Sequence, residues 1–144
     1  MKKEKRTFDL YQLSGITGPL AGHELLRHIA LPDLLGQDAN KILYYMGKNL
    51  ARKFPLNILD ELPYFFKQVG WGDLKLLKEK KTLYSYELTG PIIDVRNNYE
   101  QPINYRLECG FIAEQIRLIT GRQTEANFEV KNKNTVVFEV LVES

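Results

Sequence analysis

The chain has 144 residues, of which 44% are hydrophobic and 26% charged, and its formal net charge is +2. A chain of this length forms one domain, because about two-thirds of its unfolded surface is buried on folding. Its 20 basic and 18 acidic residues are too balanced to indicate a nucleic-acid partner. No apolar run approaches the roughly 20 residues of a membrane-spanning helix. The single cysteine excludes an internal disulfide and indicates a cytoplasmic protein.

The one basic cluster in the sequence lies in the first seven residues and consists of Lys2, Lys3, Lys5 and Arg6. Short charged termini are typically solvated, so we interpret residues 1–7 as a flexible tail, with a weak contact to an anion as the alternative. No apolar stretch follows the cluster, and we therefore expect no secretory signal. Residues 8–144 are expected to form a single domain.

The Gly-rich segment 14–22, SGITGPLAG, is a predicted loop. Its glycine spacing matches neither the dinucleotide-binding fingerprint nor the P-loop, so we do not expect it to bind phosphate. Residues 23–30, HELLRHIA, form a predicted short helix that looks like a zinc-protease helix. Its two histidines, His23 and His28, would need a spacing of four residues to share a metal. At five residues apart they point about 140° away from each other on an α-helix, so we interpret both as surface or boundary histidines.

Two helices are predicted next, at residues 38–54 and 56–70. Asp38 or Asn40 is expected to cap the first helix, and Asn57 or Asp60 the second. The inner face of the first helix is predicted to consist of Ile42, Leu43, Met46, Leu50 and Phe54. That of the second helix is predicted to consist of Leu59, Leu62, Phe65, Phe66 and Val69.

Two hairpins and one more helix complete the predicted elements. Residues 73–77 and 82–88 form the first hairpin, and residues 92–101 a loop. Residues 104–121 form a helix that is apolar on most of its circumference, which indicates that protein surrounds it on more than one side. The second hairpin joins residues 125–130 to 135–142. The last strand is apolar on both faces, which is typical of a central or covered strand.

Two glycines lie in the interior of predicted helices, where each costs about 1 kcal/mol relative to alanine. Gly47 lies in the helix 38–54 and Gly110 in the helix 104–121. A glycine in this position indicates that another backbone approaches closely. We therefore predict that the two mark one tight crossing of these helices. Together the elements indicate an α+β fold, with a helical layer packed on a four-stranded twisted antiparallel sheet.

The sequence contains no constellation of residues that supports catalysis. Cys109 lies in the apolar stripe of the helix 104–121, where a cysteine is usually a small inert hydrophobe. We find no metal-ligating cluster, no paired carboxylates and no cofactor fingerprint, and we therefore expect a protein that is not an enzyme and has no cofactor. Trp71, between Gly70 and Gly72, is interpreted as an aromatic residue at the core edge, with the wall of a pocket as the alternative. The aromatic residues concentrate in one part of the chain: Tyr44, Tyr45, Tyr64, Phe65, Phe66, Trp71, Tyr84 and Tyr86.

Five segments resemble, in their order, the four-vinyl reductase domain: KILYYMGKNLARKFP, ELPYFFKQVGWGDLKLL, YELTGPI, ECGFIAEQIRLITGRQTEANFEV and TVVFEVLV. That domain is similar in fold to the Bet-type subunits of the TRAPP vesicle-tethering complex. In length and in its sequence motifs the chain resembles the YslB-like family, small uncharacterised proteins of low-GC Gram-positive bacteria. The resemblance covers residues 36–142. Its motifs consist of glycine and apolar residues, which specify a fold better than a function.

The resemblance implies a binding domain, often dimeric, in which a cavity under the helices holds a small apolar or acyl ligand. The cysteines that many four-vinyl reductase domains carry in the last hairpin are absent here. The predicted pocket is lined by Phe65, Phe66, Trp71, Tyr84, Tyr86 and Cys109. The alternative is an adaptor subunit without a ligand that forms a homodimer through its N-terminal helices, and the apolar run 29–35 motivates this alternative.

Overall fold

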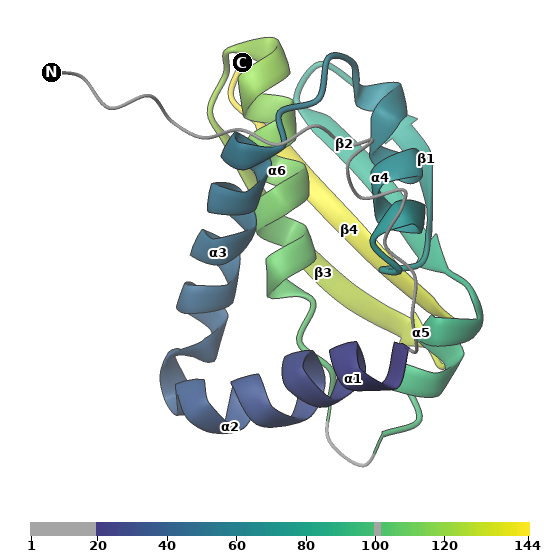
Figure 1. Ribbon diagram of the computed structural model, residues 1–144. Helices are drawn as coiled ribbons and strands as arrows, with labels where there is room; N and C mark the ends of the chain where they lie inside the picture. The colour runs from purple at the N-terminus through teal and green to yellow at the C-terminus, as the bar shows by residue number, and fades with distance from the viewer. Residues whose placement is uncertain (1–19, 100–101) are drawn as a thin grey trace, which may run out of the picture.

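The structure is a computed structural model that describes residues 20–99 and 102–144. Four antiparallel strands form one sheet, and α6 and its neighbouring helices lie on one face of it (Figure 1). The predicted α+β fold class is therefore confirmed. The predicted basic tail at residues 1–7 and most of the predicted loop at 14–22 lie outside the described residues.

The first helical segment is longer than predicted and combines two helix types in three parts. It consists of α1 (Leu20–Glu24), one π-helical turn, η2 (Leu25–Ala30), and α2 (Leu31–Leu35). The junction residues Glu24 and Leu31 both have right-handed helical backbone angles. The three parts therefore form one continuous helical segment, residues 20–35, which we call the N-terminal helix (Figure 1).

The remaining helices follow the predicted order with one addition. They are η3 (Gly36–Asp38), α3 (Ala39–Lys53), η4 (Leu59–Glu61), α4 (Leu62–Gln68), α5 (Pro91–Arg96) and α6 (Arg106–Thr120). Helix α5 is the addition, since residues 92–101 were predicted to be a loop. Pro91 stands at the first helical position, where its fixed φ angle and missing N–H favour a helix start. The predicted caps were wrong at η4, where the Glu61 side chain accepts bonds from the backbone N–H groups of Asn57 (2.8 Å) and Ile58 (3.2 Å).

The sheet consists of the two predicted hairpins joined through their second strands. Its strands are β1 (Asp73–Glu79), β2 (Leu83–Thr89), β3 (Thr124–Asn132) and β4 (Thr135–Val142). The spatial order is β1-β2-β4-β3, with Tyr84 of β2 opposite Val140 of β4. The apolar strand β4 is thus central, as predicted. Its inward side chains at positions 136, 138, 140 and 142 are buried, whereas Leu141 on the other face is exposed.

Helices α3 and α6 cross at two glycines, as predicted. A Cβ atom on Gly47 would lie 2.0 Å from the carbonyl oxygen of Leu107, and one on Gly110 would lie 2.0 Å from that of Tyr44. The two backbones are therefore in direct contact, and only glycine fits at either position.

The buried face of α3 differs from the predicted one. Leu43, Gly47 and Ala51 are buried, whereas Ile42 and Met46 are each 37% exposed. The prediction assigned the larger apolar side chains to the inner face. The close backbone approach requires small residues at the contact, so Ile42 and Met46 remain on the flanks of the helix.

Helix α6 is enclosed on all sides from Leu107 to Ile116, as its apolar sequence predicted. Its buried polar side chains bind the end of α3. Gln115 accepts a hydrogen bond from the Leu56 N–H (3.1 Å) and donates one to the Phe54 carbonyl (2.8 Å). These bonds satisfy backbone groups that the end of α3 leaves without helical partners.

Candidate functional site

The N-terminal helix turns its charged residues inward and its apolar residues outward. Within residues 21–35 the fully buried side chains are Glu24, Arg27 and His28. Leu31 and Leu35 are half-buried against the core. The outward side chains are apolar: Leu25, Leu26, Ile29 and Leu34 are 57%, 69%, 58% and 81% exposed. A helix on the surface of a globular protein ordinarily has the opposite polarity, so this segment is the one we consider as a candidate site.

Five charged or titratable side chains gather where the N-terminal helix meets α5 and the start of α6. We call this group the charged cluster, and it consists of Glu24, Arg27, His28, Arg96 and Glu108. Each is at most 8% exposed. Buried charges are stable only when they are paired, and the cluster contains two ion pairs.

The first ion pair joins Arg96 of α5 to Glu24. Arg96 is fully buried, and its Nε and Nη2 atoms donate to the Glu24 carboxylate over 2.9 and 2.7 Å. Its Nη1 and Nη2 atoms also donate to the backbone carbonyls of Trp71 (3.2 Å) and Gly70 (3.3 Å). Tyr99 donates to Glu24 from the other side (3.0 Å). Arg96 therefore ties the N-terminal helix to the Gly-Trp-Gly turn, and each of its three nitrogen atoms has a partner.

The second ion pair joins Arg27 to Glu108 of α6 and is incomplete. The Arg27 Nη2 atom donates to a Glu108 carboxylate oxygen over 2.5 Å and lies 3.5 Å from the carbonyl oxygen of Asn104. The Nε and Nη1 atoms of Arg27 and the second carboxylate oxygen of Glu108 are buried without a partner. Buried polar atoms are rarely left in this state in proteins.

The carboxylate of Glu24 and the imidazole of His28 both have perturbed pKa values. Burial raises the pKa of Glu24, but the hydrogen bonds and positive charge of Arg96 outweigh it and lower the pKa to about 2. Burial and the positive charges of Arg27 and Arg96 lower the pKa of His28 to about 4. Near neutral pH the cluster thus holds two carboxylates, two guanidinium groups and a neutral imidazole.

The two histidines lie closer together than predicted, and only one of them is at the surface. His28 is 7% exposed, and its Nε2 atom lies 3.9 Å from Glu24. The ring centroids of His23 and His28 are 6.4 Å apart. The prediction assumed an α-helix, but the π-helical turn pairs residues five positions apart and brings the two rings together. No three His, Cys, Asp or Glu side chains within residues 20–99 and 102–144 form a metal-binding group.

An open groove of about 360 Å³ runs along one flank of the N-terminal helix. We call it the N-terminal groove. Its described lining consists of His23, Leu26, Arg27, Ala30, Leu31 and Leu34. The surface of the groove is therefore largely apolar, and the incompletely paired Arg27 is the one side chain shared between the groove and the charged cluster.

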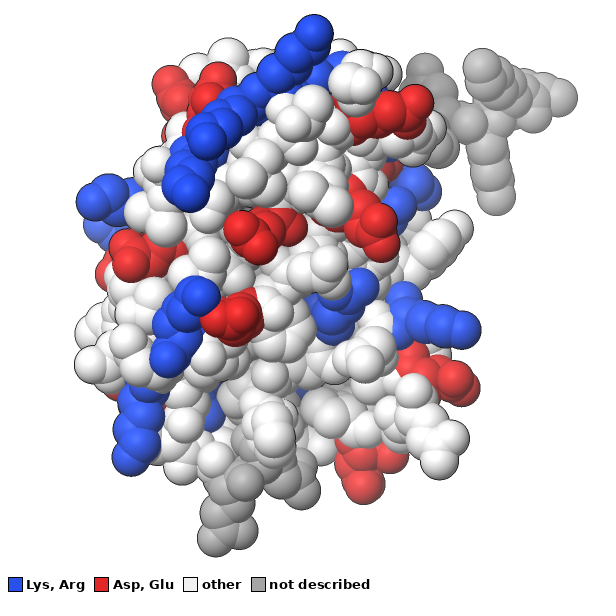
Figure 2. Space-filling model, turned by 180° about the vertical axis from the view of Figure 1, so that it is seen from behind, with Lys and Arg blue, Asp and Glu red and all other residues white. Residues whose placement is uncertain are grey.

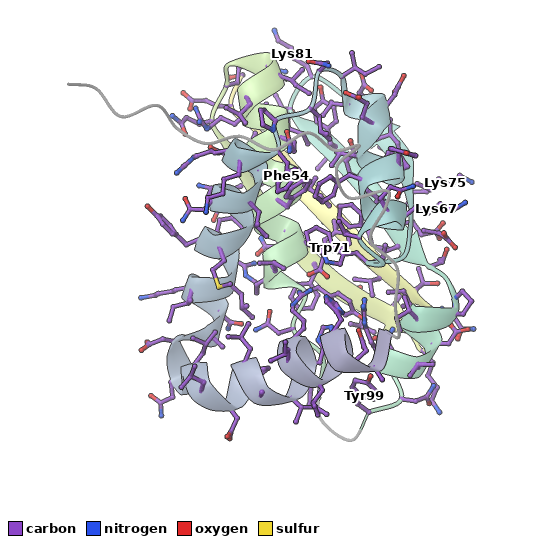
Figure 3. All side chains as sticks on the ribbon, viewed as in Figure 1. Phe54, Lys67, Trp71, Lys75, Lys81 and Tyr99 are labelled. Carbon is purple, nitrogen blue, oxygen red and sulfur yellow. The ribbon has the colours of Figure 1, made fainter. Side chains whose placement is uncertain are left out.

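Three of the six residues predicted to line a pocket pack against one another and against α6. Phe65 stacks on Phe111 at 4.3 Å between ring centroids, and Trp71 lies edge-on to Phe66 (5.1 Å) and to Phe111 (5.4 Å). Figure 3 shows Trp71 in the space between α4 and α6. Trp71 is 5% exposed, so it is a core aromatic residue in this structure.

The other three predicted lining residues are also buried. Tyr84 and Tyr86 lie on β2 and Cys109 on α6. The Tyr86 hydroxyl is buried without a partner, and burial raises its pKa well above the usual range. Burial likewise raises the pKa of the Cys109 thiol. The six residues thus belong to one core, and their role in lining a ligand pocket stays a prediction.

Comparison with known proteins identifies the family. Residues 20–141 match the family described as protein of unknown function (DUF2507). The chain belongs to this family. It is 46% identical over 111 residues to the uncharacterized protein YslB of Bacillus subtilis (strain 168). The aligned region covers 77% of this chain and 75% of that protein. The resemblance to the YslB-like family predicted from the sequence is therefore confirmed.

One solved structure confirms the fold of this DUF2507 member. A vinyl-4-reductase family protein from Methanocaldococcus jannaschii superposes with a TM-score of 0.65 and 21% identity, over 94% of this chain and 88% of that chain. A trafficking protein particle complex subunit 3 from Naegleria fowleri superposes with a TM-score of 0.44 and 12% identity, over 94% and 93%. At such identities the first similarity shows a common fold and leaves the activity of this chain open.

The far face of the sheet offers no single-sign charged surface. Figure 2, seen from behind, shows lysine, arginine, aspartate and glutamate side chains interspersed over that face. Lys131 and Glu129 on β3 form an ion pair there (2.5 Å). Among the described residues, no helix is long and apolar enough to cross a membrane.

Sequence reasoning missed the charged cluster and the groove, although a signal was present. In HELLRH the charged residues Glu24, Arg27 and His28 recur at helical spacing, and so do Leu25 and Ile29. Which of these two faces is buried depends on distant partners. Arg96 lies in a segment predicted to be a loop and Glu108 in a helix interpreted as apolar, so neither partner was predicted.

Proposed function

We propose that this DUF2507 member is a non-enzymatic, cytoplasmic domain that binds a small hydrophobic ligand in the N-terminal groove. The observation that carries the proposal is the inverted polarity of the N-terminal helix. Leu26 and Leu34 line the groove and yet are 69% and 81% exposed. Exposed apolar side chains around a concave surface are typical of a ligand or partner site. The volume of about 360 Å³ suits a small ligand.

The titratable side chains support binding over catalysis. The Cys109 thiol is fully buried, and its raised pKa keeps it protonated near neutral pH. A nucleophilic cysteine requires access and a lowered pKa. The carboxylates of Glu24 and Glu108 are buried and paired with arginines, so neither is accessible as a general base.

Native mass spectrometry of the protein purified from its own host tests this proposal. We expect an added mass that is released on denaturation, and small-molecule extraction then gives its chemistry. The variant Leu26→Ser removes an apolar wall of the groove and is expected to lose that mass. The control is Leu25→Ser, because Leu25 is the next residue and is similarly exposed but is not part of the described lining. A ligand-free wild type, or equal loss in both variants, contradicts the proposal.

A second candidate function is an adaptor subunit that dimerises through its N-terminal helices. The outer row of the N-terminal helix, Leu25 and Ile29, lies outside the described groove lining and is more than half exposed. On α3, Tyr45 is 60% exposed as well. A homodimer interface is more apolar than an ordinary protein surface, and these residues would supply its centre.

Sedimentation velocity over a wide range of protein concentrations tests the adaptor. If the adaptor is correct, the wild type sediments as a dimer and the double variant Leu25→Glu/Ile29→Glu as a monomer. A wild type that stays monomeric throughout contradicts it. Variants at neighbouring residues thus distinguish the two candidate functions. Substitution of Leu26 tests the ligand groove, and substitution of Leu25 and Ile29 tests the dimer interface.

A further inference from the structure

Two arginines are buried at the charged cluster, and they differ in how completely their donors are used. Each guanidinium group carries five N–H donors and cannot lose its charge. Arg96, fully buried, has partners for all three of its nitrogen atoms. Arg27, 7% exposed, uses only Nη2, and its Nε and Nη1 atoms lack partners. All nitrogen atoms of Arg96 thus have hydrogen-bond partners within the protein, whereas two of those of Arg27 do not.

The incomplete arginine is also the one that belongs to the groove. Arg27 lines the groove and also reaches Glu108 of α6, so one side chain belongs to both the apolar lining and the charged cluster. Its unpaired Nε and Nη1 atoms are buried, and a ligand in the groove reaches them when the Arg27 side chain turns toward the lining. The neighbouring lining residues, Leu26, Ala30 and Leu31, offer no acceptor on their side chains. Ligand sites commonly have this composition, in which apolar walls surround a few polar groups that fix the orientation of the ligand.

We propose that the N-terminal groove binds an amphipathic carboxylic acid, with the carboxylate at Arg27 and the apolar chain along Leu26, Leu31 and Leu34. This inference rests on the proposed function and names the chemical class of its ligand. A carboxylate supplies the acceptors that the Nε and Nη1 atoms lack, and hydrogen bonds between arginine and carboxylate are among the strongest in proteins.

The charges of the cluster disfavour more than one negative charge on the ligand. Two arginines and two glutamates balance each other, and the Glu108 carboxylate lies 2.5 Å from Arg27. A phosphate dianion at Arg27 would bring two negative charges next to Glu108, whereas a carboxylate brings one. A neutral alcohol of the same length would fit the apolar lining but form weaker hydrogen bonds to Arg27.

Calorimetric titration of the 144-residue chain, after extraction of any bound small molecule, with decanoic acid and with decanol tests this inference. We expect the acid to bind at least about tenfold more tightly than the alcohol, because a hydrogen bond between arginine and a carboxylate is stronger than one between arginine and a neutral hydroxyl. The same comparison is then made on three variants, which separate the contribution of the ligand's headgroup from that of its apolar tail.

The first variant is the double substitution Arg27→Met/Glu108→Met. It removes both members of the ion pair, since Arg27→Met alone would leave Glu108 buried without a counter-charge. We expect it to bind the acid about as weakly as the alcohol, with its fold verified by circular dichroism. Leu26→Ser is expected to weaken the binding of the acid and of the alcohol by similar factors, because the apolar tails of both contact the apolar wall of the groove. Leu25→Ser, outside the described lining, is expected to leave both affinities unchanged.

Each alternative outcome has a distinct meaning. If the acid and the alcohol bind equally well to the wild type, the carboxylate inference is wrong and the proposed binding function stands. If the folded double variant keeps its preference for the acid, Arg27 does not bind the headgroup and the inference is wrong. If neither compound binds and the wild type is a dimer that Leu26→Ser dissociates, the groove is a subunit interface and both proposals fail.

Discussion

Helices on two sides of α6 contact it in opposite ways. On one side α3 crosses it at Gly47 and Gly110, where backbone touches backbone. At its N-terminal end the N-terminal helix contacts it through Arg27 and Glu108, an ion pair. At the crossing itself the first contact consists of small residues and contains no charge, and one ion pair, between Arg52 of α3 and Glu114 of α6 (2.6 Å), lies farther along the two helices. The second depends on charges that have been removed from water, and it leaves the apolar side of the helix exposed.

The difference indicates which contact can respond to a ligand or to pH. Close packing at the glycines has no alternative arrangement of similar energy, because any shift separates atoms already in contact. The contact of the N-terminal helix changes its free energy whenever Glu24 or His28 changes protonation, and Arg27 has donors left for a ligand. We therefore interpret α3, α6 and the sheet as a scaffold and the N-terminal helix as its functional element.

The largest expected effect is at the glycine crossing. In Gly47→Val a Cβ atom would lie 2.0 Å from the Leu107 carbonyl oxygen, so the two helices must separate. We expect a loss of more than about 4 kcal/mol in the free energy of unfolding, or no folded protein. Urea denaturation measures the loss. The control is Gly22→Ala on the N-terminal helix, where a Cβ atom meets nothing within 4 Å, and it is expected to be neutral or slightly stabilising. Similar losses in both variants would contradict the contrast between the contacts.

Replacing Arg96, the arginine whose nitrogen atoms all have partners, is expected to have the next largest effect on stability. Arg96→Met leaves the buried Glu24 carboxylate and the carbonyls of Gly70 and Trp71 without their donors. Breaking a buried ion pair from one side costs about 3 to 5 kcal/mol. The double variant Arg96→Met/Glu24→Met is expected to recover part of this loss, since it leaves no unpaired charge. Urea denaturation of both variants measures this, and a double variant less stable than Arg96→Met would contradict the role of the pair.

The sequence predicted the scaffold well because its signals are local. The period of the strands, the apolar circumference of α6 and the two interior glycines each follow from neighbouring residues. The inner face of α3 was wrong because a tight crossing places small residues inside, and that depends on the partner helix. The N-terminal helix was interpreted least well, since the burial of Glu24 depends on Arg96, which is 72 residues away.

The candidate site was predicted only in its general chemistry. The predicted apolar lining was assigned to aromatic residues such as Phe65 and Trp71, which the structure places in the core. Their role in lining a ligand pocket stays a prediction, and the groove proposed as the site is lined by leucines that the sequence pattern could not distinguish from core residues. A π-helical turn in HELLRH shifts the phase of the side chains, and no residue type in that segment indicates such a turn.

Acid is expected to weaken the contact of the N-terminal helix before it affects the scaffold. The folded-state pKa of His28 is lowered to about 4 and that of Glu24 to about 2, so the unfolded chain binds more protons at low pH. The stabilisation by His28 is complete above its unfolded pKa of 6.5 and is lost as the pH falls towards 4. That by Glu24 is lost between 4.5 and about 2. Each contributes about 2 to 3 kcal/mol to the free energy of unfolding.

Urea midpoints measured from pH 8 to pH 3 test this pH dependence. The variant His28→Gln is expected to flatten the curve between pH 6.5 and 4, the interval that separates the two pKa values of His28. His23→Gln is the comparison variant, because His23 is 39% exposed and meets the cluster only at its edge, with its Nδ1 atom 3.2 Å from a Glu24 carboxylate oxygen. If both variants follow the wild-type curve, burial of neutral His28 does not contribute to the contact.

A smaller effect is expected from the one side-chain hydrogen bond that α3 makes to the sheet edge. The Tyr44 hydroxyl accepts a bond from the Ala126 N–H of β3 over 3.1 Å. Tyr44→Phe leaves that N–H without a protein partner at a half-buried position, which costs about 1 kcal/mol. Thermal unfolding measures the change. A loss as large as that of Arg96→Met would show that the α3 side depends on polar contacts as strongly as the N-terminal helix does, which contradicts the contrast between the two contacts.

The smallest effect is expected from the outer row of the N-terminal helix. Leu25 and Ile29 are 57% and 58% exposed, so replacing both with serine should change the free energy of unfolding by no more than about 0.5 kcal/mol per residue. Urea denaturation at a low and a high protein concentration measures the change. An unchanged stability at both concentrations means that this row is exposed to solvent, and it favours the ligand-binding function over the adaptor function. A loss that grows with protein concentration means that a second copy covers it, because only association makes stability depend on concentration.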